Sequence, residues 1–338
     1  HMEYVEDPGY EPQWMARQHH DYQIEGNTVG YYVPGMIPNM DGNKIILCHQ
    51  DVHNPEISDK PLTDDTIIEI NKDGEIIWRW NCNEHFREMR FSEEAKNTIC
   101  AHPDMVPNGT GDWMHVNCVS VLGPNKWYDA GDERFHPDNL IIDGRATNVL
   151  AIISKETGKI VWKLGPDYTE RNARFIGQIV GQHHTHMIPK GLPGEGNILV
   201  FDNGGWAGYG AQNPCSPTGE QNALRAYSRV TEFDPVSMEI VWECNPATLG
   251  KQMPFLEDHF YSPYISSAQR LPNGNTLITQ GSDGRLFEVT PDFEIVWEYI
   301  SPYFGTQNIR RNMVYRSYRY PYDWAPQAEK PEEIAIEP

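Results

Sequence analysis

The sequence has no long apolar run, no paired cysteine motif and few basic residues. No stretch approaches the roughly 20 apolar residues that a helix needs to span a bilayer, so we expect no membrane association. Lysine and arginine number 27 against 48 acidic residues, which leaves a net charge of −21. Such an acidic chain disfavours nucleic-acid binding, because nothing offsets phosphate repulsion. The cysteines form no CxxC pair and lie far apart, at Cys48, Cys82, Cys100, Cys118, Cys215 and Cys244.

The scattered cysteines favour free thiols in a reducing compartment over a zinc knuckle or disulfides. No charged-then-apolar signal segment is visible near the start. We therefore expect a cytoplasmic protein, with a periplasmic location as the alternative if a signal peptide has been removed. We expect residues 1–18 to form an N-terminal extension and residues 19–324 a single domain. Residues 325–338 are rich in Pro and Glu and predict a flexible tail.

An internal repeat organises the chain. An alternating apolar strand, a polar turn and a strand with a tryptophan near its end recur at residues 66–80, 149–165, 229–245 and 285–299. The tryptophans at the matching place are Trp78, Trp162, Trp242 and Trp297. A second type of hairpin precedes each of these segments, at residues 19–32, 115–145, 182–204 and 266–281. The repeat predicts four-stranded units, each with an inner and an outer hairpin.

Radial repetition of such units is typical of a β-propeller, which leaves only short sheet edges. Residues 312–320 predict one more inner strand, so direct counting favours five blades. The insertions leave room for six. We expect the repeated tryptophans to pack between blades. The main helical candidate is the insert at 85–97.

Histidines recur at the start of the inner strands. His20, His115 and His183 begin three of them, and Ser266 or Ser267 lies at the corresponding place in the fourth. Equivalent positions of a ring converge on its axis, so we expect these imidazoles to meet in one pocket with Arg145. Imidazole can act as a nucleophile or a general base near neutral pH, and a guanidinium binds sulfate, phosphate or carboxylate. The pattern predicts an enzyme site for a small aromatic or anionic substrate. A structural hydrogen-bonding role for each histidine is the alternative.

Further histidines lie close to this set. Alternation along the strand sends His184 and His186 to the face opposite His183, unless the strand is bulged. His49 and His53 form another candidate pair. No tight ligand spacing such as HExxH occurs, so neither a metal nor a cofactor is predicted. The residues that we assign to substrate binding are His184, His186, His49, Asn117 and Ser266.

Several short motifs follow one another in a distinctive order. They are DWMHVN (112–117), IIDGR (141–145), QHH (182–184), NILVFDNG (197–204), SRVTEFD (228–234) and LPNGNTLI (271–278). Together they resemble the bacterial arylsulfotransferase family, over about residues 19–320. The resemblance implies a six-bladed propeller that moves a sulfuryl group between phenols without a nucleotide cofactor. It also implies that His183 is the nucleophile, that His115 and Arg145 hold the sulfate, and that His20 is the remaining channel histidine.

The chain departs from that family in several places. The signal and small β-sandwich of exported members are not visible, and Asp143-Gly144-Arg145 replaces the usual SSR after a long insertion at 123–138. A shared fold does not fix chemistry. A propeller hydrolase or lyase that uses the same His/Arg pocket, with or without a metal, is therefore one alternative. A non-catalytic binding propeller is the other. No donor, acceptor or oligomeric state is predicted.

Overall fold

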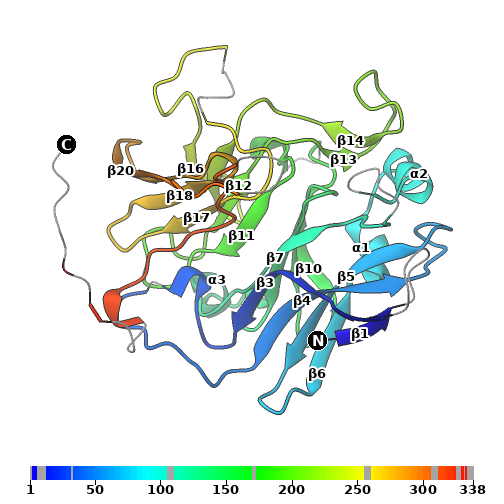
Figure 1. Cartoon of the computed structure of the whole chain (residues 1–338), viewed down its shortest axis with the longest axis horizontal. Helices are drawn as coiled ribbons and strands as arrows, with labels where there is room; N and C mark the ends of the chain where they lie inside the picture. Colours follow the sequence, from blue (N-terminus) through cyan, green and yellow to red (C-terminus); the bar gives the residue numbers. More distant parts are fainter. Residues whose placement is uncertain are drawn as a thin grey trace.

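The structure is a computed structural model that describes residues 2–5, 13–31, 33–104, 110–169, 173–254, 260–305, 311–324, 329–330 and 332. These residues form four four-stranded antiparallel sheets and two short hairpins (Figure 1). The first two sheets contain β3 (Gln18–Ile24), β4 (Lys44–Val52), β5 (Leu62–Ile70), β6 (Ile76–Asn81), β7 (Val116–Val121), β8 (Leu140–Gly144), β9 (Val149–Ile153) and β10 (Ile160–Leu164). The third and fourth contain β11 (His183–Met187), β12 (Ile198–Asp202), β15 (Arg229–Phe233), β16 (Ile240–Cys244), β17 (Ser267–Arg270), β18 (Thr276–Gln280), β19 (Arg285–Val289) and β20 (Ile295–Ile300).

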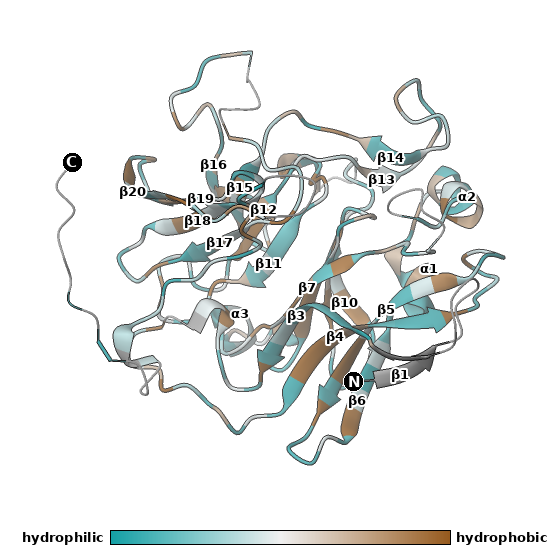
Figure 2. Ribbon diagram, in the orientation of Figure 1, coloured by the Kyte–Doolittle hydropathy of each residue, from teal (hydrophilic) through white to brown (hydrophobic). Residues whose placement is uncertain are grey.

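Each sheet is a meander whose first strand is innermost. The inner strands contact one another in sequence order, β3 with β7, β7 with β11 and β11 with β17. The middle strands β8 and β9 are buried along their whole length, whereas the outer strand β20 is exposed throughout. Figure 2 shows hydrophobic residues along β4 and β10. This is the strand order of propeller blades, and the all-β prediction is confirmed.

Alternation along β12 shows how the sheets pack on each other. Ile198 and Val200 belong to the core shared with the second sheet, while Leu199 and Phe201 belong to the core shared with the fourth. All four side chains are fully buried. Because successive side chains of a strand point to opposite faces, one strand supplies two cores. A near-continuous apolar run is therefore required there.

The repeated tryptophans connect neighbouring sheets, as predicted, at three of the four places. The indole N–H of Trp78 donates to Lys155 O at 3.0 Å, that of Trp162 to Pro235 O at 2.9 Å, and that of Trp242 to Pro291 O at 3.0 Å. Each acceptor lies in the outer hairpin of the next sheet. Trp297, in β20 of the fourth sheet, differs. It is 40% exposed and lies under the guanidinium of Arg319.

A Trp162→Phe variant is expected to lose about 1–3 kcal/mol of unfolding free energy. The change removes a buried hydrogen bond, which contributes about 1 kcal/mol, and leaves part of the indole volume empty. Trp297→Phe is the matched control and is expected to cost less than about 1 kcal/mol, because that ring is half-exposed and its N–H has no acceptor in a following sheet among the described residues. Urea unfolding of both variants measures the difference. Equal losses would contradict the inter-sheet role of Trp162.

Residues 312–320 are not a strand, so that prediction was wrong. Their backbone nevertheless takes the place of an inner strand beside β17. In the first sheet the Gln23 side chain accepts the backbone N–H of Val121 in β7 at 2.8 Å. In the fourth sheet the equivalent Gln269 accepts that of Arg319 at 2.7 Å. The five or six blades are not confirmed: the described residues make four complete sheets and a single segment in a fifth place.

The inserts form helices and hairpins outside the four sheets. The predicted helix at 85–97 is divided into α1 (Phe86–Met89) and α2 (Glu93–Ala101), because Arg90 adopts the left-handed conformation between them. The insertion at 123–138 contains the short α3 (Lys126–Asp129). The two additional hairpins pair β1 (Met2–Val5) with β2 (Gln13–Ala16) and β13 (Ala207–Tyr209) with β14 (Glu220–Ala223). Across the described segments, none of the helices has the length and apolar character needed to cross a membrane.

Candidate active site

Each inner strand carries a left-handed residue at the same place. The backbone angle φ is 51° at His20 and at His115, 56° at His184 and 92° at Ser266. In the first three sheets the register with the second strand also shifts at or just after this residue. Such an irregularity changes the face to which the following side chains point. In backbone terms the equivalent of His20 and His115 is therefore His184, one residue beyond the predicted His183.

The four residues predicted to be catalytic nevertheless lie together. The rings of His20 and His115 meet edge to face with their centroids 4.8 Å apart. Arg145 follows β8, and its backbone N–H donates to His115 O at 3.1 Å. Burial lowers the pKa of His183 well below its usual value, and the nearby Arg145, His115 and His20 lower it further. Side chains from three sheets thus form one polar cluster.

Arg145 supplies the positive charge of this cluster. Its side chain is half-buried, and within the described ranges it makes no ion pair or side-chain hydrogen bond. Burial lowers the pKa of its guanidinium, while Asp112 and Tyr261 act in the opposite direction. An arginine remains protonated under such shifts. A guanidinium with unused donors near the neutral His183 imidazole favours binding of an anion.

His183 is held in one tautomer. Its Nε2 accepts the backbone N–H of Ile265 at 3.1 Å, so the ring proton must be on Nδ1. Nδ1 then donates to Asn203 Oδ1 at 2.8 Å. The Asn203 amide is oriented in turn by donating to the carbonyl oxygens of Ser262 and Ile265. The imidazole is therefore neutral, fixed and only 3% exposed.

His115 and His20 are arranged differently. His115 Nδ1 lies 2.6 Å from Asp112 Oδ2, which leaves Nε2 to accept or donate a proton. Burial alone would raise the pKa of Asp112, but the hydrogen bond and charge of His115 lower it overall, so the carboxylate is ionised. Burial, followed by repulsion from His115, lowers the pKa of His20 to about 3. His20 is therefore a neutral base at physiological pH.

The residues assigned to substrate binding do not lie in one place. His184 donates from Nε2 to Tyr318 Oη at 2.8 Å, and His186 lies beside it with ring centroids 4.6 Å apart. The Asn117 amide donates to Gln182 O at 3.0 Å and ties β7 to β11. Ser266 Oγ bonds Ser262 Oγ at 2.8 Å and accepts the N–H of Gly281. Asn117 and Ser266 are fully buried, and their side chains hydrogen-bond to other parts of the protein.

A cavity of about 290 Å³ opens next to His20, and part of its lining consists of residues that sequence reasoning missed. Its charged centre is an ion pair between Arg316 Nη1 and Asp21 Oδ1 at 2.8 Å. Its lining includes His20, Asp21, His184, Tyr315, Arg316 and Tyr318. The three residues from 315–318 come from the segment that replaces a fifth inner strand. Its alternation of tyrosine and arginine, YRSYRY, was the available signal for a polar lining.

The first sheet contains a second group of polar residues that includes the predicted His49. The His49 ring stacks on that of His19, with centroids 3.7 Å apart, and both rings face Asp65. Burial, then repulsion from His115, lowers the pKa of His19 to about 4. Burial and the nearby Asp112 raise the pKa of Asp65 to about 7. His19 adjoins His20, so this group lies directly behind the four-residue cluster.

Solved structures resemble the chain only distantly. They include a protein of unknown function from Bacteroides caccae, at 13% identity and a TM-score of 0.35, covering 70% of this chain and 54% of that one. Virginiamycin B lyase from Staphylococcus aureus matches at 12% identity and a TM-score of 0.35, covering 83% and 61%. The Dos1 propeller matches at 11% identity and a TM-score of 0.38, covering 81% and 48%. The chain thus spans about half to three fifths of the length of these structures. Similarities of this extent assign no function.

Sequence comparison is more informative. No curated protein gives a significant match. The arylsulfotransferase (ASST) family, in contrast, matches residues 11–300. Because this match extends over most of the chain, the protein belongs to the arylsulfotransferase (ASST) family.

Proposed function

We propose that the protein transfers a sulfuryl group from an aryl sulfate to a phenol, with His183 as the nucleophile. Family membership supports an arylsulfotransferase-like function and aryl substrates. The observation that carries the finer proposal is the position of Arg145. Its guanidinium lacks a partner among the described residues and acts electrostatically on His183, which also has His115 and His20 as neighbours.

Arg145 is the group suited to hold the transferred sulfuryl. Its planar fork can donate two parallel hydrogen bonds to sulfuryl oxygens. In a half-buried site these bonds are stronger than in water. Charge that develops on the sulfuryl oxygens during transfer is stabilised by the same donors, which is the form of stabilisation that lowers a reaction barrier.

In the first step the Nε2 lone pair of His183 attacks sulfur. A nitrogen–sulfur bond forms, the bond from sulfur to the aryl oxygen breaks, and the aryl oxygen leaves with the electron pair as a phenolate. The ring already carries its proton on Nδ1, and this N–H donates a hydrogen bond to Asn203 Oδ1. Asn203 therefore orients the ring and bonds to the N–H that becomes more acidic when Nε2 is sulfated.

In the second step the phenolic acceptor attacks the same sulfur. Its oxygen forms a bond to sulfur, the nitrogen–sulfur bond breaks, and the electron pair returns to His183. The acceptor proton passes to His115 Nε2, which is available because Asp112 holds Nδ1. That proton finally neutralises the first phenolate. The two steps together convert one aryl sulfate and one acceptor phenol into the phenol of the donor and the aryl sulfate of the acceptor.

The proposal places one requirement on the backbone. In the structure the Ile265 N–H occupies the His183 lone pair that must attack sulfur. Ile265 adopts the left-handed conformation and precedes Ser266, which does so as well. We expect this turn to shift when an aryl sulfate binds, because a nitrogen that accepts a hydrogen bond is a poorer nucleophile.

The test is turnover of p-nitrophenyl sulfate with and without a phenol acceptor. We expect p-nitrophenol to be released faster as the acceptor concentration rises, with one sulfated acceptor formed for each p-nitrophenol. Mass spectrometry of protein mixed with donor alone should locate one added sulfuryl group on the peptide that contains His183.

Two results would count against the proposal. Release that is independent of acceptor and yields inorganic sulfate would indicate a hydrolase that uses the His115–Asp112 pair to activate water. No release from any aryl sulfate, together with no labelled peptide, would show that the cluster does not perform sulfuryl transfer.

A further inference from the structure

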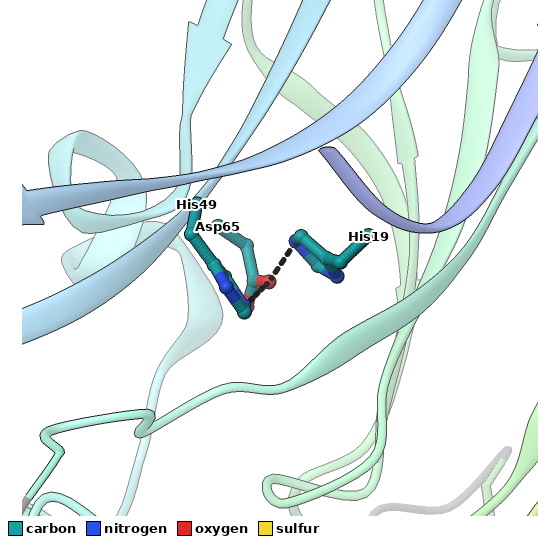
Figure 3. Close-up of side chains that lie close together, drawn as sticks. All are labelled: His19, His49 and Asp65. Atoms are coloured by element: carbon teal, nitrogen blue, oxygen red, sulfur yellow. Dashed lines mark ion pairs between the residues drawn. The ribbon is translucent and has the colours of Figure 1, made fainter. Parts of the chain in front are cut away.

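Three consecutive strands of the first sheet bring two imidazoles and a carboxylate together. His19 lies on β3, His49 on β4 and Asp65 on β5, and His49 is the direct cross-strand partner of Asp65. His19 Nε2 lies 3.3 Å and His49 Nε2 3.7 Å from Asp65 Oδ1. Figure 3 shows both rings directed at this carboxylate. The three ligand atoms all lie within 4.8 Å of one another.

Protein hydrogen bonds do not account for these three atoms. Among the described residues, His19 Nε2, His49 Nε2 and Asp65 Oδ1 are buried and have no hydrogen-bond partner. The opposite atoms of two of the groups are satisfied: Asp65 Oδ2 accepts the Val116 N–H at 2.9 Å, and His19 Nδ1 bonds His20 Nδ1 at 2.8 Å. Buried polar atoms are nearly always paired. Three unpaired atoms that converge on one point therefore indicate a ligand that they share.

The spacing and chemistry of these atoms fit a metal ion. Two ligands bound at about 2.0–2.1 Å to one tetrahedral ion lie about 3.3 Å apart, close to the 3.3 and 3.7 Å observed here. Imidazole nitrogens with one carboxylate suit Zn²⁺ and similar ions, whereas Ca²⁺ and Mg²⁺ prefer all-oxygen sites. We infer that His19, His49 and Asp65 bind a divalent first-row transition metal ion. The two rings are 20° from parallel, so they must rotate apart to share it.

Neighbouring groups support this site. Asp112 Oδ1 is a further buried oxygen without a partner in the described part of the chain, and its charge acts on His19, His49 and Asp65. A metal on His19 Nε2 would fix the proton on Nδ1, which then donates to His20 Nδ1. Such an outer hydrogen bond is the usual partner of a metal-bound histidine. The ion would lie behind the proposed transfer cluster and is independent of whether that cluster transfers sulfuryl groups.

The test is Zn²⁺ binding by the full chain after chelator treatment and desalting. We expect one tightly bound ion per chain by calorimetry and elemental analysis, and a higher thermal unfolding temperature with Zn²⁺ than without. Asp65→Asn keeps an oxygen for the Val116 N–H, and His49→Gln changes an imidazole on the adjacent strand. Each is expected to weaken binding at least about 100-fold, more than the loss of an outer-sphere partner. His53→Gln, just beyond β4, is the matched control and should bind like the unchanged protein.

The site would be refuted if the unchanged protein took up no ion, or if it bound Zn²⁺ as tightly after both Asp65→Asn and His49→Gln. Should one variant fail to fold, as judged by its unfolding transition, the other decides. Substitution with Co²⁺ gives a second measurement. A visible absorption band that disappears in His49→Gln but persists in His53→Gln identifies imidazole coordination directly, without reference to activity.

Discussion

A His183→Gln variant is expected to transfer sulfuryl groups from p-nitrophenyl sulfate at least about 10³-fold more slowly than the unchanged protein. The nucleophilic nitrogen is lost, so the covalent route through a sulfated ring is closed. Arg145 and the His115–Asp112 pair remain, so donor binding is expected to change little. The values of kcat and KM for p-nitrophenol release, measured at a saturating phenol concentration, separate the two effects.

The control must distinguish chemistry from packing, because His183 also bonds Asn203 and Ile265. Asn203→Asp keeps an acceptor for Nδ1 and leaves the imidazole in place. It loses the two hydrogen bonds that the Asn203 amide donates to Ser262 O and Ile265 O, so we expect a lower unfolding temperature than that of the unchanged protein, yet far more activity than His183→Gln retains. If His183→Gln folded normally and kept more than a tenth of the activity, His183 would not be the nucleophile.

The repeat was sufficient to predict much of this architecture. Matching tryptophans located the outer hairpins, because an indole that donates to the next sheet must recur at one place in each unit. The inner-strand histidines also gathered as expected. Strands that begin at equivalent points of radially repeated sheets converge, whatever the length of the loops between them. His20, His115 and His183 meet for that reason.

The local backbone could not be predicted in the same way. Alternation assumes an unbroken strand, yet His20, His115 and His184 each adopt a left-handed conformation that alters the register. Histidine adopts this conformation at some sites but does not require it, so the residue types alone do not indicate it. The segment 312–320 shows the same limit. Its composition suits a strand, but none of the described strands pairs with it.

Polar clusters within a single sheet were missed for a different reason. His19, His49 and Asp65 are distant in sequence and adjoin only because β4 and β5 pair with His49 opposite Asp65. A shift of one residue in that register would move Asp65 to the other face. The register of β5 on β4 depends on the connection at residues 53–61, and that of β3 on β4 depends on the bulge in β3. Neither feature can be inferred from residue types.

Asp202 shows how buried charge stabilises the third sheet. It lies at the end of β12, is fully buried, and accepts hydrogen bonds from Arg225 at 2.9 Å and Arg229 at 2.8 Å. Its other oxygen accepts the Val180 N–H at 2.9 Å. Burial by itself would raise the pKa of this carboxyl. The two guanidinium groups outweigh that effect, so the pKa lies below its usual value of 3.8. These contacts join three segments of the chain.

An Asp202→Asn variant is expected to lose about 3–5 kcal/mol of unfolding free energy at pH 7, because removal of one partner leaves buried guanidinium charge uncompensated. Asparagine retains an oxygen for the Val180 N–H, so the loss reports the charge. Since the folded pKa is depressed, the stabilisation is present above about pH 4 and disappears as the pH falls through the folded value. Urea unfolding at pH 7 and below pH 4 should therefore show a difference between variant and unchanged protein that narrows in acid.

Glu93→Gln removes an exposed partner of Lys96 and should cost under about 1 kcal/mol at either pH. An equally small loss for Asp202→Asn would mean that Arg229 is neutralised by Glu243 alone.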